Sequence, residues 1–211
     1  MSLLSIEGLG ISFGGLKAVS DVSFGVKPGE IVSVIGPNGA GKTTLFNMIS
    51  GVYRPEFGKV ILNGEDVTAL SPHLLARRGM CRTFQNLQVF QSMTVLENTI
   101  AGYHLQESGS VLADILNLPA SRRRAKEAEA GARALLKRVG LERAAEREAG
   151  SLSYGSLKRL EIARAMALKP KVLLLDEPAA GCNAVETEEI DHLIAEIAAS
   201  GVAILLVEHD M

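Results

Sequence analysis

The sequence predicts an α/β protein with a mainly parallel sheet at its core and a helical insert in its middle. Short apolar, β-branched runs alternate with amphipathic segments, and the composition changes character between residues 92 and 168. Strands that are apolar throughout indicate a sheet covered on both faces, as parallel sheets are. With 211 residues, 47% of them hydrophobic, the chain can bury a core of ordinary domain size.

The elements follow from these local patterns in chain order. Six apolar runs are expected to form strands: residues 3–6, 22–26, 31–35, 60–62, 172–175 and 202–207. The Asn63-Gly64 pair predicts a tight turn after the fourth of them. Three segments are expected to be helical: residues 42–50, the Ala- and Glu-rich stretch ending at residue 138, and residues 184–199.

Charge and composition exclude several functions. The formal net charge is -2 and only 4% of residues are aromatic, so neither a basic surface nor stacking platforms for nucleic acid are expected. Cys81 and Cys182 fit no metal spacing and are expected to be small packing residues in a reduced compartment. No signal peptide is recognisable, and the longest apolar run is too short to cross a membrane. A soluble chain is therefore expected, with any membrane role coming through a partner.

A phosphate-binding loop is predicted between the third strand and the first helix. Residues 36–43 read GPNGAGKT and fit the pattern G-x-x-x-x-G-K-[ST]. Glycines let successive backbone N–H groups point at phosphate oxygens, and the helix N-terminus adds its positive dipole end. Lys42 is expected to reach the β- and γ-phosphates, and Thr43 to coordinate Mg²⁺. The predicted nucleotide-binding set is Gly36, Pro37, Asn38, Gly39, Ala40, Gly41, Lys42, Thr43 and Thr44. The alternative is a glycine-rich turn with a chance lysine.

Two acids follow the apolar strand at residues 172–175. An acid at the end of such a strand holds Mg²⁺ in phosphate-loop ATPases, and Asp176 fits that role. Glu177, one residue further, can polarise a water that attacks the γ-phosphate. Two acids in an exposed loop are the alternative, and the strand together with the phosphate loop favours the catalytic interpretation.

A third motif indicates the family. Residues 152–156 read LSYGS and precede a further expected helix, rich in Arg, Ile and Ala, that includes residues 159–165. This motif resembles the LSGGQ signature of ABC transporter ATPases. The resemblance implies a phosphate-loop NTPase core with a mainly parallel sheet, an antiparallel N-terminal β subdomain and a helical insert. It implies one domain over residues 1–211, with residues 1–84 and 169–211 as catalytic core, residues 85–168 as helical signature subdomain, and the C-terminal part of the family domain missing.

The resemblance also implies individual roles. Gln85 matches the glutamine that senses Mg²⁺ and nucleotide, and His209 the switch histidine that contacts the γ-phosphate. Phe13 matches the aromatic residue that stacks on adenine. Ser153 and Gly155 would bind the γ-phosphate of ATP held by a second subunit in a head-to-tail dimer. Taken alone, Gln85 is an ordinary surface residue, His209 an ordinary chain-end histidine, and Phe13 a core residue.

One branch of the family is favoured by several stretches, among them residues 13–19, 82–86, 90–98 and 177–181. They resemble the ATP-binding subunit of branched-chain amino acid importers. That implies an ATPase that hydrolyses ATP with Mg²⁺, works with transmembrane permease subunits as a homodimer or heterodimer, and touches neither the solute nor nucleic acid. It would be cytoplasmic, peripheral on the inner face of the cell membrane. Urea or amide transport, lipid or lipopolysaccharide export, a non-transport ABC ATPase and a regulatory protein that binds ATP without hydrolysing it remain alternatives.

Several residues differ from the family pattern, and these differences bear on how efficiently the chain hydrolyses ATP. Ser156 stands where the family has glutamine, and this is expected to weaken contact with the ribose of the opposing nucleotide. Cys182 and Ala184 replace leucine and proline, and both changes are expected to be mild. His209 lies two residues before the end of the sequence and is expected to be poorly held there.

Overall fold

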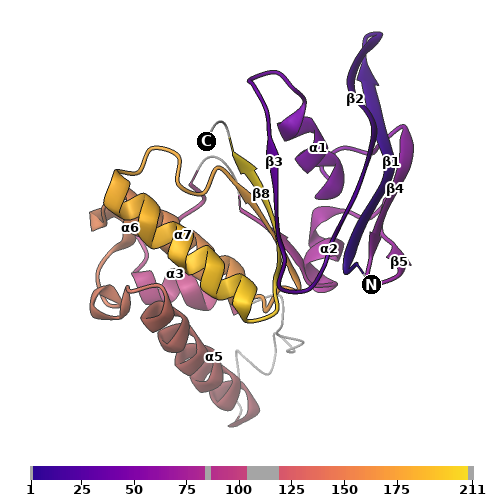
Figure 1. Ribbon diagram of the computed structural model, residues 1–211. Coiled ribbons are helices and arrows are strands. Elements are labelled where there is room, and N and C mark those ends of the chain that lie inside the picture. The colour runs from indigo at the N-terminus through magenta and orange to yellow at the C-terminus, as the bar shows by residue number, and fades with distance from the viewer. Residues whose placement is uncertain (1, 84–86, 104–118, 209–211) are drawn as a thin grey trace. The chain divides into compact units, whose positions relative to one another are not determined.

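The computed structural model describes residues 2–83, 87–103 and 119–208. The chain forms two compact units (Figure 1). The first, called the core unit here, contains residues 1–85, 170–180 and 191–211; the second, the helical unit, contains residues 86–169 and 181–190. Each unit is described by itself.

An antiparallel sheet opens the core unit. It has the order β2-β1-β4-β5 and consists of β2 (Leu16–Val26), β1 (Leu4–Phe13), β4 (Phe57–Leu62) and β5 (Glu65–Asp66). The predicted turn at Asn63-Gly64 is confirmed, because both residues have positive φ (51° and 81°) between β4 and β5. The first two strands are longer than the sequence predicted. The prediction depended on short apolar runs, and polar residues and glycines interrupt such runs in the remainder of β1 and β2.

A parallel sheet with the order β3-β8-β7-β6 forms the centre of the core unit. Its strands are β3 (Ile31–Ile35), β8 (Ala203–Glu208), β7 (Val172–Asp176) and β6 (Met80–Arg82). β7 is buried at every position, as predicted for a parallel strand. β3 is at one edge of the described sheet and exposes alternate residues, so the prediction of burial on both faces was wrong for this strand. β6 was not predicted, because its three residues are too few for a recognisable pattern.

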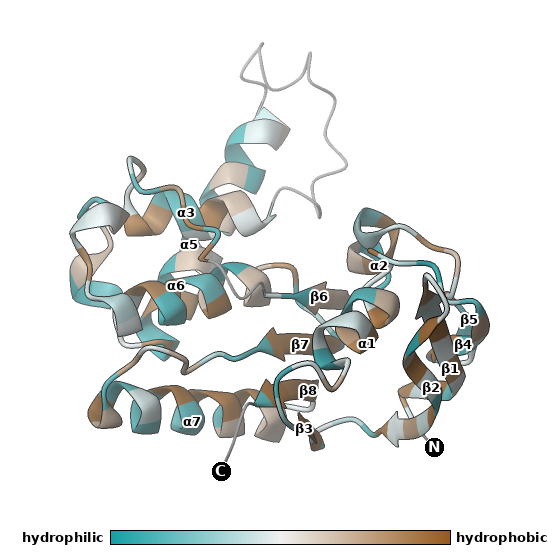
Figure 2. Ribbon diagram, turned by 90° about the horizontal axis from the view of Figure 1, so that it is seen from above, coloured by the Kyte–Doolittle hydropathy of each residue, from teal (hydrophilic) through white to brown (hydrophobic). Residues whose placement is uncertain are grey.

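Helix α1 (Lys42–Ile49) connects the two sheets of the core unit. Its buried residues Leu45, Phe46, Met48 and Ile49 belong to one apolar cluster with residues of β1, β4, β7 and β8. Figure 2 shows α1 between the two sheets. A shorter helix, α2 (Pro72–Arg77), contributes Leu75 to the same cluster. The residues after β3 are therefore anchored by a helix that is buried on both sides.

Cys81 in β6 is buried, and burial raises the pKa of its thiol to about 12. A thiol in this state stays protonated and unreactive, which agrees with the packing role predicted for it.

The helical unit consists of α3 (Val95–Ala101), α5 (Pro119–Arg138), α6 (Tyr154–Met166) and the start of α7 (Ala184–Ala199), with short 3₁₀ turns at Glu142–Ala144 and Ala149–Ser151. α3, α5 and α6 pack against one another. Ala128, Ala132 and Leu136 recur at four-residue spacing and form the buried stripe of α5. Among the helices that the structure describes, none is both long and apolar enough to cross a membrane.

Candidate nucleotide-binding site

The strand register brings the predicted phosphate loop and the acid pair to one edge of the parallel sheet. Ile35, the last residue of β3, lies opposite Glu208 of β8, and Asp176, the last residue of β7, lies opposite Val207. Loops that leave the carboxyl ends of parallel strands share an edge, and this edge is where α/β proteins bind ligands. The loop at residues 36–43 and the pair at residues 176–177 therefore begin on the same side of the core unit.

Two glycines give the phosphate loop its shape. Gly39 and Gly41 have φ of 81° and 86°, a conformation that favours glycine. A Cβ on Gly41 would also collide with the carbonyl oxygen of Ala18, so no other residue fits there. Gly41 is the N-cap of α1, and within the described residues this helix start has no side-chain cap and no acid in its first turn. Free N–H groups and an uncompensated positive dipole end suit an anion.

Lys42 lies within this loop. The residue is 7% exposed, and its ammonium donates hydrogen bonds to the carbonyl oxygens of Gly36 and, at 3.0 Å, of Pro37. Thr43 follows and is exposed, while Thr44 is half-buried. A cation held beside an uncapped helix start is the arrangement that the motif predicts for binding phosphates.

Asp176 forms a buried ion pair that the sequence analysis missed. Arg82 Nη2 lies 2.8 Å from Asp176 Oδ2, and the two side chains are 8% and 3% exposed. Arg82 Nη1 also donates to Asn47 Oδ1 at 2.7 Å and to Ser50 Oγ at 2.8 Å, and the guanidinium lies 5.6 Å from the centre of the Phe46 ring. Arg82 therefore ties the acid at the end of β7 to α1.

We expect Arg82→Met to lower the free energy of unfolding by about 3 kcal/mol, because it leaves the buried Asp176 carboxylate without its cation. Urea-induced unfolding followed by circular dichroism would measure the change. Arg78→Met is the matched control, since it removes a half-exposed ion pair to Glu65 with a 2.9 Å contact and should cost less than about 1 kcal/mol. Equal losses in the two variants would contradict a special role for Arg82.

Glu177 has an unusual backbone conformation. Its φ is 50°, in the left-handed region, and the residue is 8% exposed. A residue other than glycine adopts this conformation at a cost of about 1 kcal/mol. The backbone N–H of Glu177 donates to the carbonyl oxygen of Val207 at 3.1 Å, so the neighbouring strand holds it. Strain of this kind gathers at functional sites, which supports Glu177 as a reacting group.

Phe13 ends β1 and is 48% exposed. Its ring meets that of Tyr53 edge to face, with centroids 5.7 Å apart and an angle of 70° between the planes. The expectation that Phe13 alone would be a core residue does not hold, and its free face is compatible with the predicted stacking on a base.

The signature residues lie in the helical unit. Ser153 is the N-cap of α6, and its Oγ accepts the backbone N–H of Ser156 at 3.3 Å. Gly155 is buried, and a Cβ there would lie 2.5 Å from Cδ of Glu186. A side chain at position 155 would therefore have to displace that of Glu186, a neighbour that the sequence pattern did not reveal. Gln85 and His209 lie outside the described residues, so their predicted roles remain predictions.

Comparisons with known proteins agree with the motifs. The ABC transporter family pattern matches residues 19–180. Over 210 residues, the chain is 47% identical to the high-affinity branched-chain amino acid transport ATP-binding protein LivG of Escherichia coli (strain K12), covering 99% of this chain and 82% of LivG. It is 46% identical, with the same coverage, to the corresponding protein BraF of Pseudomonas aeruginosa.

Solved structures show the same fold. The ADP conformation of an ATP-binding cassette of an ABC transporter aligns with a TM-score of 0.86 at 34% identity, covering 100% of this chain and 82% of that chain. A dimeric cassette in a post-hydrolysis state, bound to ADP and Pi, aligns with a TM-score of 0.78 at 26% identity, covering 98% and 88%.

Proposed function

The chain belongs to the ABC transporter family, and we propose that it is the ATP-hydrolysing subunit of an importer for branched-chain amino acids. The site geometry supports the ATPase, because the phosphate loop leads into α1, which has no side-chain cap among the described residues, and the Lys42 ammonium bonds to the loop's carbonyl oxygens. Similarity to LivG and BraF over 99% of the chain supports the solute class. The solute is not expected to touch this subunit, since an ATP-hydrolysing subunit acts on its permease partners rather than on the solute.

We propose the following division of labour within the core unit. Residues 36–44 hold the phosphates, with Lys42 on the β- and γ-phosphates. Thr43 and Asp176 supply oxygen ligands to Mg²⁺, which needs few protein ligands when it also binds phosphate oxygens. Mg²⁺ bound there supplies charge neutralisation for phosphoryl transfer. Glu177 orients and deprotonates the attacking water. The remaining proposed contacts are Phe13 on adenine, Gln85 on Mg²⁺ and the water, and His209 on the γ-phosphate.

We propose that two subunits pair head to tail, so that Ser153 and Gly155 of one subunit bind the γ-phosphate of ATP held by the other. Ser153 is exposed at the start of a 13-residue helix, where an anion is favoured. The similarity to a dimeric cassette supports pairing in general. ATP can drive closure only because it binds the closed dimer more tightly than the separate subunits.

The segment from Phe90 to Asn98 is the proposed contact with a permease at the inner face of the membrane. Phe90 is 53% exposed, and the guanidinium of Arg164 lies 5.4 Å from the centre of its ring. Asn98 is fully buried; it accepts the backbone N–H of Phe90 and donates to its carbonyl oxygen, both at 2.9 Å. This segment is therefore a fixed support that presents an aromatic side chain, a type of residue enriched in protein interfaces.

Replacing the chromosomal copy with a Lys42→Ala variant tests the solute. High-affinity uptake of radiolabelled leucine, isoleucine and valine is expected to be lost, because import would have no ATP-driven step. Urea uptake and lipopolysaccharide export measured in the same cells serve as controls and should be unchanged. Loss of either control activity with normal leucine uptake would replace the proposed solute by that alternative.

A further inference from the structure

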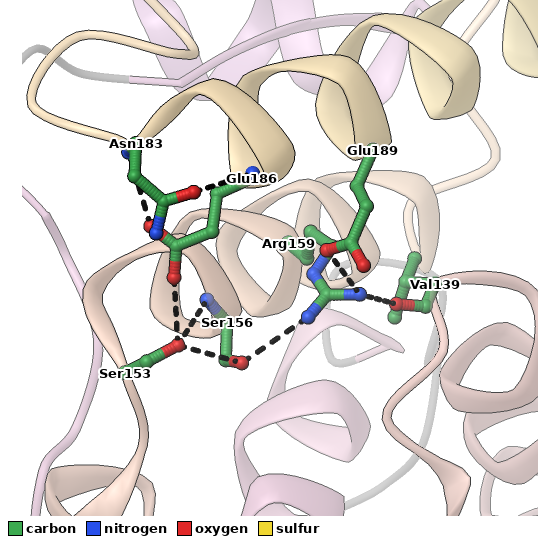
Figure 3. Close-up of polar contacts among 7 residues, drawn as sticks. All are labelled: Val139, Ser153, Ser156, Arg159, Asn183, Glu186 and Glu189. Carbon is green, nitrogen blue, oxygen red and sulfur yellow. Dashed lines mark hydrogen bonds and ion pairs between the residues drawn. The ribbon is translucent and has the colours of Figure 1, made fainter.

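A chain of hydrogen bonds links α6 to the start of α7 within the helical unit (Figure 3). Arg159 Nη2 donates to Ser156 Oγ at 3.2 Å, and Ser156 Oγ lies 3.1 Å from Ser153 Oγ. The Ser153 hydroxyl in turn donates to Glu186 Oε1 at 3.0 Å. The other carboxylate oxygen of Glu186 accepts the backbone N–H of Asn183 at 3.3 Å, and Asn183 Oδ1 accepts the N–H of Glu186 at 3.0 Å.

Arg159 and Glu186, at the two ends of this series of hydrogen bonds, determine which atom donates in each bond between them. A guanidinium can only donate hydrogen bonds, and a carboxylate can only accept them. Ser153 has a single hydroxyl proton, and Glu186 has none to offer, so that proton lies between Ser153 and Glu186. The Ser156 hydroxyl, which accepts from Arg159, must then donate to Ser153 Oγ. Both hydroxyl protons therefore point towards Glu186.

Arg159 is itself held in place. Its Nη1 lies 3.3 Å from Glu189 Oε2 and 3.4 Å from the carbonyl oxygen of Val139, and its side chain is 17% exposed. The short hydroxyl of Ser156 fills the gap between this guanidinium and Ser153. Donation into Ser153 Oγ polarises the hydroxyl and makes it a stronger donor. Serine at position 156 therefore has a structural partner that the sequence comparison with the family's glutamine did not reveal.

To bind Ser153, a γ-phosphate oxygen must accept a hydrogen bond from the Ser153 hydroxyl. In this structure Glu186 already accepts that hydrogen bond. Phosphate oxygens are acceptors, and the carboxylate of Glu186 has a charge of the same sign. It lies close to the signature glycine, since a Cβ on Gly155 would be 2.7 Å from Glu186 Oε1. Resting on the proposed dimer, we infer that Glu186 is a positioning residue that competes with the partner's γ-phosphate for the Ser153 proton. Glu186 thereby sets the ATP concentration at which two subunits close.

Glu186→Gln tests this competition with little change in shape. The glutamine carbonyl can still accept the N–H of Asn183, so the start of α7 stays capped. Its amide donates to Ser153 Oγ, which frees the Ser153 proton for phosphate, and the charge is removed. In a Glu177→Gln background, where hydrolysis is suppressed, half-maximal dimer formation is expected at an ATP concentration lower by about three- to tenfold. Light scattering during an ATP titration would measure it.

With Glu177 intact, Glu186→Gln should lower the KM for ATP by a similar factor and change kcat by less than about twofold, because it acts on closure rather than on water attack. Glu188→Gln, which removes an exposed carboxylate from the same helix, is the matched control and should shift neither quantity. A Ser153→Ala background has no hydroxyl proton at this position for Glu186 and phosphate to share. There, the effect of Glu186→Gln on the ATP concentration for half-maximal dimer formation should fall below about twofold.

The results separate this inference from the function on which it rests. A parent protein that binds a fluorescent ATP analogue but never dimerises overturns the head-to-tail site and the inference with it. A parent that dimerises while Glu186→Gln leaves the ATP requirement unchanged or raises it overturns the inference alone. The same is true if Glu188→Gln produces an equal shift, because the effect would then be general charge rather than the Ser153 proton.

Discussion

Glu177→Gln is expected to reduce ATP turnover by about 10²–10⁴-fold while nucleotide binding is retained. The glutamine has the same length and can occupy the same position after β7, but its amide cannot take a proton from water. The structure adds a reason to expect a large effect, since Glu177 is 8% exposed and its φ is 50°, with its backbone N–H bound to Val207. Phosphate release from the purified chain, alone and with its permease subunits, would measure the loss.

The same variant should accumulate an ATP-bound dimer, because closure no longer ends in hydrolysis. Glu177→Asp is the informative companion. It keeps a carboxylate and tolerates the left-handed backbone well, so its turnover should lie between those of the parent and Glu177→Gln. Near-normal turnover in Glu177→Gln would remove Glu177 from the role of base. A variant that no longer binds a fluorescent ATP analogue would instead indicate that the site had been disrupted.

The sequence predicted those parts of the site in which neighbouring residues along the chain form a motif. The loop at residues 36–43 follows an apolar strand and opens a helix, and both neighbours are present as β3 and α1. Ser153 lies at the start of α6, where it is the N-cap, a position that serine favours. The helices ending at residue 138 and spanning residues 184–199 were also predicted, because good helix formers continue over several turns.

The contacts that were missed depend on which distant segments meet. Arg82 and Asp176 are 94 positions apart, and their pairing depends on β6 lying beside β7 in a particular register. The one available signal for this pair was Arg82 itself, three residues before Gln85. The strand that carries it, β6, was too short to recognise from the sequence. The contact from Ser153 to Glu186 spans 33 positions and depends on the packing of α6 beside α7. Neither helix pattern specifies that neighbour.

The second large effect is expected at the phosphate loop, where Lys42→Ala should weaken ATP binding at least about 100-fold. The ammonium is held over the loop by the carbonyl oxygens of Gly36 and Pro37, beside an α1 start that has no side-chain cap within the described residues. Removing it takes away the one cationic side chain of residues 36–43 while the backbone N–H groups remain. Titration with a fluorescent ATP analogue would give the affinity directly.

Two further variants separate charge from shape. Lys42→Met keeps most of the side-chain volume and should lose affinity to a similar extent, since the methionine offers no positive charge to phosphate. Lys27→Ala removes an exposed lysine from the same unit and should leave affinity unchanged. If Lys42→Met bound ATP as well as the parent, backbone N–H groups and the helix dipole would be sufficient for binding, and the role assigned to the ammonium would be wrong. Equal unfolding midpoints for the variants would show that the lost affinity comes from the missing cation rather than from a disordered loop.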